Sequence, residues 1–158
     1  MPRRFWLLKS EPTTFSIEDL KNSRSQTANW DGVRNYQARN FLRDDIKISD
    51  GVLFYHSNVE PIGIAGEAIV VGEGYPDKSA FDPSDIHFDP KSDPKKPTWI
   101  TVDIKFIRKC KTIITLKTLR YLPSLKEMKV LQRGMRLSVQ PVTPKEWEII
   151  MDFSEWGS

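Results

Sequence analysis

The fold is decided by the stretch Asp50-Gly51-Val52-Leu53-Phe54-Tyr55-His56-Ser57. Asp50-Gly51 is a turn signal, and the apolar and aromatic run that follows it is typical of a buried strand. A second strand-like run occupies residues 63–71, and only a short segment separates the two runs. Two strands in succession do not fit the strand–helix alternation of a doubly wound parallel sheet.

The residues before this stretch predict one strand and two helices. Phe5–Leu8 is a short apolar run that indicates a buried first strand. Ser16, with an acidic residue three positions later at Asp19, has the pattern of a helix N-cap. Asp31-Gly32 predicts a turn, and residues 35–43 predict a helix with several arginines near one side.

The residues after it predict two further strands and three helices before the chain ends. Trp99–Ile107 alternates between polar and apolar side chains, which indicates a half-buried strand. The other elements are expected in this order: short helices at 116–122 and 124–131, a strand at 136–142 and a closing helix from Thr143.

Residues 72–98 have a different character from the rest of the chain. Asp-Pro and Lys-Pro pairs recur there, and the segment shows neither a strand period nor a helix period. We expect one long loop that its aromatic side chains order locally. Loops of this length in compact domains are usually functional or mobile. The whole chain, residues 1–158, is then a single α+β domain whose strands curl into a small mixed sheet or barrel flanked by short helices.

Composition excludes several classes of protein. With 39% hydrophobic and 28% charged residues, the chain is an ordinary globular protein and not a disordered one. One cysteine rules out an intrachain disulfide and a cysteine-rich zinc module. No apolar run is long enough to span a membrane.

The charge is unevenly distributed along the chain. The net charge is +3 overall, but it is −3 over residues 61–99 and +5 over residues 100–158. Residues 104–136 hold ten basic residues and a single acid, Glu127. This cluster indicates either a nucleic-acid footprint or a solvated basic face.

Few residues have the spacing that catalysis or metal binding requires. His56, His87 and Cys110 are scattered, so we expect no metal site, and no phosphate-binding loop or dinucleotide fingerprint occurs, so we expect no cofactor. Tyr55, His56 and Ser57 place a base beside hydroxyls, but neighbouring side chains of a strand point to opposite faces. Lys9 with Glu11 or Asp31 forms either a proton-transfer pair or a structural ion pair.

The richest stretch for recognition runs from Asn29 to Phe41. It places Trp30 at a polar turn and follows it with Asp31, Arg34, Asn35, Tyr36, Gln37 and Arg39. An aromatic ring beside hydrogen-bonding groups suits a planar heterocycle, and stacking of a base on such a ring contributes ~1–3 kcal/mol. The alternative is that Trp30 caps the core while the arginines are solvated.

Five long motifs follow one another along the chain. They are Trp6-Leu7-Leu8-Lys9-Ser10-Glu11-Pro12, Phe15-Ser16-Ile17-Glu18-Asp19-Leu20, Trp30-Asp31-Gly32-Val33-Arg34-Asn35-Tyr36-Gln37-Ala38-Arg39-Asn40, Phe54-Tyr55-His56-Ser57 and Arg136-Leu137-Ser138-Val139-Gln140-Pro141-Val142. In this order they resemble the EVE domain family. The resemblance covers almost the whole chain. It implies a PUA-like fold, a small mixed β-barrel with helices around it, and kinship with YTH domains, which hold a methylated base in an aromatic cage.

The resemblance also implies a function and a set of site residues. EVE domains are thought to read modified bases in DNA or RNA, so we expect a non-enzymatic reader. Trp30 looks like the first wall of the cage, and Phe54 to Ser57 resemble the strand that floors the pocket. The expected base pocket comprises Lys9, Ser10, Glu11, Trp30, Asp31, Asn35, Tyr36, Tyr55, His56, Ser57 and Trp99, and the expected phosphate-binding residues are Arg34, Arg39, Arg133 and Arg136.

One residue departs from the YTH pattern. Glu11 stands where YTH domains have a neutral amide, and a carboxylate only accepts hydrogen bonds. It therefore favours a base edge that presents a donor, such as the exocyclic amine of cytosine or adenine, and N6-methyladenine is not transferred as the ligand. The second wall of the cage is open among Tyr36, Tyr55 and Trp99.

Two other functions remain as alternatives. The PUA-like superfamily also contains ASCH domains, some of which resemble amidohydrolases that act on modified nucleosides through a lysine and a glutamate, here Lys9 and Glu11. A protein-interaction module without a working pocket is the other. The chain shows no basic N-terminal extension of the kind seen in nuclear relatives, so we expect a bacterial, cytoplasmic, stand-alone domain.

Overall fold

The computed structural model describes residues 2–157 of the chain. Seven strands form a single mixed sheet. The strands are β1 (Phe5–Ser10), β2 (Thr27–Asn29), β3 (Gly51–His56), β4 (Gly63–Pro76), β5 (Ile100–Thr115), β6 (Val139–Val142) and β7 (Trp156–Gly157). The α-helices are α1 (Ile17–Lys21), α2 (Tyr36–Asn40), α3 (Leu116–Arg120) and α4 (Pro144–Phe153). Short 3₁₀ helices are η1 (Arg24–Gln26), η3 (Lys78–Phe81), η4 (Pro123–Leu125) and η5 (Lys129–Leu131), and η2 (Phe41–Asp45) is a π-helix. The expected α+β class is confirmed.

The sheet is open. Its strand order is β2-β5-β4-β3-β1-β6, and β7 pairs with β5 off this path. β1 and β3 are parallel, whereas every other pair is antiparallel. The expectation of a closed barrel is wrong, because β2 and β6 stand at opposite ends of the order and do not pair with each other.

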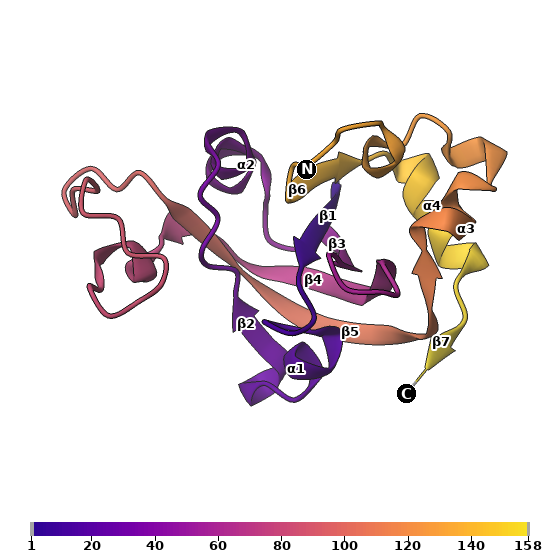
Figure 1. Cartoon of the computed structure of the whole chain (residues 1–158), viewed down its shortest axis with the longest axis horizontal. Coiled ribbons are helices and arrows are strands. Elements are labelled where there is room, and N and C mark those ends of the chain that lie inside the picture. The colour runs from indigo at the N-terminus through magenta and orange to yellow at the C-terminus, as the bar shows by residue number, and fades with distance from the viewer. Residues whose placement is uncertain (1, 158) are drawn as a thin grey trace.

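Both faces of the sheet are buried, which explains the continuous apolar run of β3. Alternate residues of that strand enter two separate cores, with Val52 and Phe54 on one face and Leu53 and Tyr55 on the other. Helix α1 and the α2–η2 segment cover the first face, while α3, α4 and η4 cover the second. In Figure 1, α3 and α4 lie at one end of the long β4–β5 ribbon, whereas α1 lies below the middle of that ribbon and α2 lies above it.

Two of the predicted helix starts are confirmed by their capping residues. Ser16 caps α1 through a capping box with Asp19, and Thr143 caps α4 through one with Glu146. The two helices expected at 116–131 are shorter than predicted, since α3 ends at Arg120 and two single turns replace the second helix. Within residues 2–157, no helix has the length and apolarity needed to cross a membrane.

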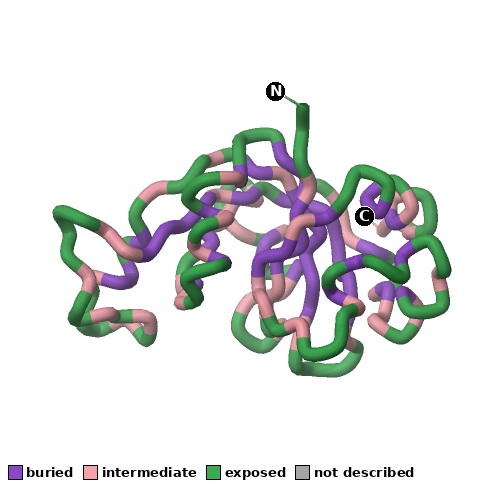
Figure 2. Tube along the Cα trace, turned by 90° about the horizontal axis from the view of Figure 1, so that it is seen from above, coloured by how far each residue is buried: buried purple, intermediate pink, exposed green. Residues whose placement is uncertain are grey.

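The segment at 72–98 is only partly a loop. β4 continues through Pro76, and η3 follows before the irregular segment that leads to β5. Four aspartates order that segment, because Asp82, Asp85, Asp89 and Asp93 each accept a hydrogen bond from the backbone N–H two residues later. Figure 2 shows this segment projecting from the purple strands as mostly exposed and intermediate chain.

Candidate functional site

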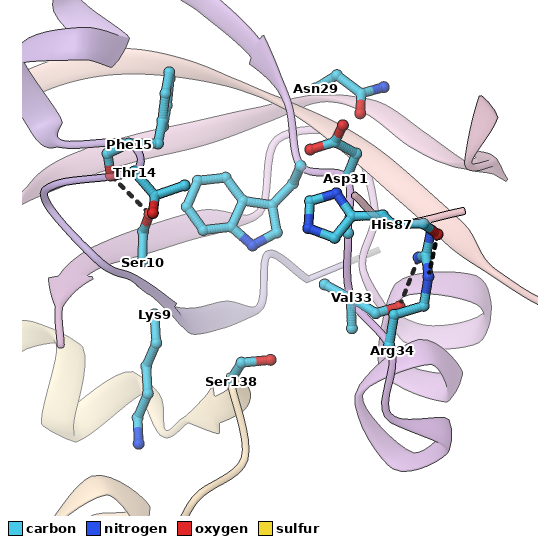
Figure 3. A pocket seen from close by; sticks show the side chains of 12 residues that line it. Lys9, Ser10, Thr14, Phe15, Asn29, Asp31, Val33, Arg34, His87 and Ser138 are labelled. Carbon is cyan, nitrogen blue, oxygen red and sulfur yellow. Dashed lines mark hydrogen bonds between the residues drawn. The ribbon is translucent and has the colours of Figure 1, made fainter. Parts of the chain in front are cut away.

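A cavity of about 390 Å³, here called the base pocket, opens where β1 and β2 end and the β4–β5 connection folds back (Figure 3). Its lining combines two apolar walls with hydroxyls, an amide and charged groups. The lining residues are Lys9, Ser10, Thr14, Phe15, Asn29, Trp30, Asp31, Gly32, Val33, Arg34, His87 and Ser138. A cavity of this size and mixed lining is typical of a small-ligand site.

Trp30 belongs to the core and to the base pocket at once. It follows β2, and its backbone N–H donates to Val102 O at 2.7 Å. The indole is 7% exposed and packs edge-on against the rings of Phe54 and Phe15, with centroid distances of 5.3 and 6.4 Å. The indole N–H makes no hydrogen bond to any described residue. A buried ring therefore presents a free donor beside the cavity.

Asp77 fixes the loop after Trp30. Its buried carboxylate accepts hydrogen bonds from the Gly32 N–H at 2.8 Å, from Arg34 Nη1 at 3.0 Å and from the Ser79 hydroxyl at 2.6 Å. Burial alone would raise the pKa of Asp77, but the bonds from Ser79, Gly32 and Arg34 together hold that pKa below its ordinary value. The carboxylate is thus ionised and anchors the pocket loop to the end of β4.

His87 comes from the far side of the β4–β5 connection. The Arg34 guanidinium donates to the His87 carbonyl at 2.7 and 3.1 Å, and this holds the connection against the pocket. Gly32 has φ of +79°, and a Cβ there would come within 2.5 Å of the His87 ring. Only glycine allows both this backbone and this close approach.

Asp31 lies at the exposed rim, and its pKa is raised. Partial burial raises its pKa first, and the neighbouring carboxylates Asp77 and Asp85 raise it further. His87 Nδ1 lies 3.2 Å from Asp85 Oδ1, and one ligand-type atom from each of Asp31, Asp85 and His87 falls within 4.8 Å of the others. Exposed acids often gather in this way without an ion, so the group indicates a strongly polar rim.

Lys9 separates the base pocket from a second cavity of about 570 Å³ and lines both. Its Nζ donates to Met135 O at 3.4 Å and lies 5.8 Å from the centre of the Tyr55 ring, and both of those residues line the second cavity. Burial lowers the pKa of Lys9. In Figure 3 the Lys9 side chain points away from Asp31 and His87.

The structure brings some of the predicted pocket residues together and separates others. Lys9, Ser10, Trp30 and Asp31 line the base pocket, and so does Arg34, which was expected to hold phosphate. The residues Glu11, Asn35, Tyr36, Tyr55, His56, Ser57 and Trp99 do not line it.

The separated residues each have another structural partner. Glu11 accepts a hydrogen bond from Asn58 Nδ2 at 2.6 Å, and Asn35 caps α2 by accepting from the Ala38 N–H. The exposed ring of Tyr36 lies against Trp99 with centroids 5.1 Å apart, and this pair lies beyond the Arg34 guanidinium.

The predicted strand Tyr55-His56-Ser57 points elsewhere because its side chains alternate. Tyr55 and Ser57 line the second cavity. His56 is buried on the opposite face, where its Nε2 accepts the Ile17 N–H at 3.1 Å, and burial lowers its pKa. This bond occupies the nitrogen that would act as a base toward a hydroxyl. Lys9 and Glu11 likewise bond to different partners, Met135 and Asn58.

The four arginines expected to bind phosphate differ in whether their guanidinium groups already have partners in the protein. Arg34 is paired with Asp77 at 3.0 Å, and Arg39 donates to Thr98 O and to Asn40. Arg133 lines the second cavity and Arg136 is exposed, and neither forms an ion pair with a described residue.

Sequence reasoning missed several residues that line the base pocket. Phe15, Asn29, Gly32, Val33 and Ser138 lie inside or beside the quoted family motifs, so the motifs contained the signal without assigning the role. Thr14 directly precedes one motif. His87 lies in the irregular β4–β5 connection, and no local pattern marks it.

Comparison with known proteins identifies the family of the chain. A family model described as the EVE domain matches residues 4–153. The chain belongs to the EVE domain family. This EVE domain is 45% identical to thymocyte nuclear protein 1 of Mus musculus over 168 residues, which cover 96% of the chain and 74% of the relative.

Solved structures of other proteins share the fold. A protein from Leishmania major superposes with a TM-score of 0.90 at 44% identity, covering 96% of this EVE domain and 94% of that chain. The crystal structure of the human THYN1 protein in complex with 5-methylcytosine-containing DNA superposes with a TM-score of 0.87 at 42% identity, covering 94% and 96%.

Proposed function

We propose that this EVE domain is a non-enzymatic reader that binds a modified cytosine of DNA in the base pocket. The support from relatives is that the human THYN1 protein, 42% identical over 94% of this chain, was crystallised with 5-methylcytosine-containing DNA. The observation that carries the proposal in this chain is the base pocket itself, which is lined by the Trp30 ring with its free indole N–H and by the Asp31 carboxylate, to which no described side chain donates.

The polar groups of the base pocket complement the edge of cytosine. Cytosine presents an exocyclic amine, which donates, beside a ring nitrogen and a carbonyl, which accept. The Asp31 carboxylate accepts from the amine, and the free indole N–H of Trp30 donates to an acceptor of the base. Thymine also bears a methyl group at C5, but it presents a carbonyl where cytosine has the amine, so Asp31 rejects it.

The apolar walls account for the modification. Phe15 and Val33 line the same cavity as Asp31, and they offer a surface for a C5-methyl group. One buried methyl group is worth about 0.8 kcal/mol, so methylation alone gives a modest preference. Recognition of the amine therefore selects the base, and the apolar wall selects the modification.

A base inside a duplex cannot reach this cavity. It enters only from a single strand or after flipping out of the helix, which costs a few kcal/mol. Contacts to the phosphates must offset this cost, so binding weakens as salt increases. We expect tighter binding to a single-stranded or mismatched site than to a fully paired one.

The test is a fluorescence anisotropy titration with oligonucleotides that differ at one position. The position holds 5-methylcytosine, cytosine or thymine in single strands, duplexes and the matching RNA. We expect the affinity order 5-methylcytosine, cytosine, thymine, with single strands above duplexes. Equal affinities for all three bases would overturn the proposal.

The amidohydrolase alternative is separated by a second measurement. Acylated and alkylated nucleosides are incubated with the protein, and products are followed by chromatography. We expect no turnover, because Lys9 and Glu11 bond to different partners and the His56 nitrogen is occupied. Product formation that scales with protein concentration would favour the hydrolase.

A further inference from the structure

We propose that the second cavity is the subsite for the sugar–phosphate backbone next to the bound base, so that the DNA strand leaves the base pocket on the Lys9 side. This inference rests on the proposed function, since it assumes that a base occupies the base pocket. It adds the path of the strand and the residues that hold it.

The first argument is the charge of the second cavity. Lys9, Arg120 and Arg133 line it, and its lining contains no aspartate or glutamate. Its volume of about 570 Å³ exceeds that of the base pocket, which suits a phosphate with its sugar. Glu11 bonds to the lining residue Asn58 but does not itself line the cavity, so the three lining cations give it a positive charge that attracts a phosphodiester.

The second argument is that these cations are free to bind. Arg120 and Arg133 form no ion pair among residues 2–157, and Lys9 bonds only to a backbone carbonyl. Three other arginines are already committed to ion pairs. Arg34 is paired with Asp77, Arg43 with Asp44 and Arg108 with Glu67. A phosphate therefore displaces no existing ion pair at the second cavity.

The third argument is the opposite side of the base pocket. A third cavity of about 350 Å³ adjoins it through Asn29 and Asp31, and we call it the acidic cavity. Asp31, Asp77, Asp82 and Asp85 line it against a single cation, Lys78. A polyanion is repelled there. The two neighbours of the base pocket thus have opposite sign, and this gives the strand one favourable direction.

Lys9 connects the two sites that the strand would occupy. It follows the buried residues of β1 and lines both the base pocket and the second cavity. Its Nζ contacts belong to the second cavity, beside Tyr55 and Met135. A phosphate held there lies directly beside a base stacked on Trp30, so one chain can fill both cavities.

The experiment uses the full chain carrying Arg120→Glu with Arg133→Glu. The matched control is Lys105→Glu with Lys111→Glu, which changes the net charge equally at two exposed positions of β5 that line none of these cavities. Anisotropy titrations at several salt concentrations use single strands with 5-methylcytosine or cytosine. Thermal melting confirms that both variants are folded.

We expect the cavity variant to lose affinity for both oligonucleotides by the same factor, because phosphates carry no base information. The dependence of log affinity on log salt should flatten by about 0.7 for each phosphate that the variant no longer neutralises. The control should keep the wild-type slope. A cavity variant with wild-type affinity and slope would overturn the subsite.

The free nucleoside 5-methyldeoxycytidine separates a backbone subsite from damage to the base pocket. It carries no phosphate, so the cavity variant should bind it as the wild type does, as measured by NMR titration. Loss of nucleoside binding would contradict the proposal. If the wild type itself does not prefer 5-methylcytosine over cytosine, the proposed function fails, whatever the salt slopes show.

The direction of the strand gives an independent test. Two short oligonucleotides carry 5-methylcytosine at the 5′ end or at the 3′ end, so that the chain extends to opposite sides of the base. One of them should bind more tightly, and only that one should weaken in the cavity variant. Equal affinities for both would show that the acidic cavity does not exclude the strand.

Discussion

Trp30→Ala tests whether one side chain serves both the core and the base pocket. The indole is 7% exposed and touches the rings of Phe54 and Phe15, so its removal leaves a cavity in the core. Removing a buried tryptophan costs about 3–5 kcal/mol. A domain of this size has about 5–15 kcal/mol of stability, so the variant should remain folded, with a Tm lower by roughly 6–20 °C.

The effect on binding has a different origin. Stacking of a base on an aromatic ring is worth about 1–3 kcal/mol, which corresponds to roughly a 5- to 150-fold loss of affinity. Trp30→Phe keeps a ring and loses the indole N–H, which costs one neutral hydrogen bond of about 0.5–1.5 kcal/mol. We therefore expect the affinity for 5-methylcytosine DNA to fall in the order wild type, Trp30→Phe, Trp30→Ala.

The control separates loss of the ring from loss of stability. Phe54 is fully buried, packs on Trp30 and does not line the base pocket, so Phe54→Leu loosens the same core without touching the base. Melting and anisotropy are measured on each variant, with titrations well below the lowest Tm. The reasoning is refuted if Trp30→Ala binds as the wild type does, or if Phe54→Leu loses as much affinity as Trp30→Ala.

Three further predictions concern carboxylates. Asp31→Asn should reduce the ratio of the affinities for 5-methylcytosine and thymine by about 10- to 150-fold, since an amide can also donate a hydrogen bond. Oligonucleotide titration measures this ratio. If the ratio is unchanged in Asp31→Asn but changes in Glu11→Gln, Glu11 and not Asp31 reads the base. Because burial raises the Asp31 pKa, the affinity of the wild type should fall as pH drops through that raised value, whereas the affinity of Asp31→Asn should not change over that range. At neutral pH, Asp31→Asn should have a higher Tm than the wild type, because it removes an unfavourable charge. The Asp77 pKa is held below its ordinary value, so its stabilising effect is present at neutral pH and is lost as pH falls through the lowered value; Asp77→Asn should lower Tm at neutral pH and should converge with the wild type in acid.

Much of the fold was predictable because local signals agreed with the tertiary structure. Ser16 and Thr143 begin helices through side-chain hydrogen bonds with residues three positions away, and such bonds are visible in the sequence. β3 was predictable as a strand because both faces of the sheet are covered, so that all of its residues are apolar or buried. The closure of the sheet was not predictable in this way, because it depends on which strands pair and not on where they lie.

The candidate site was less predictable because its residues meet only in three dimensions. The Trp30 stretch was recognisable from an aromatic ring beside polar groups. His87 could not be found, since it reaches the base pocket only when Asp77 and Arg34 fold the β4–β5 connection back. Glu11 was assigned by analogy along the strand, but β1 ends at Ser10, and the side chain turns to Asn58 instead.

The structure compensates one carboxylate at the base pocket, Asp77, and leaves another, Asp31, without a side-chain donor. Partial burial, and after it the neighbouring carboxylates Asp77 and Asp85, disfavour an ionised Asp31 and raise its pKa. Asp77 relieves its own burial through Gly32, Arg34 and Ser79, whereas no described side chain donates to Asp31. The base pocket therefore holds one acceptor, Asp31, and one donor, the Trp30 indole N–H, that no described side chain satisfies, and under the proposed function both bond to the edge of a cytosine.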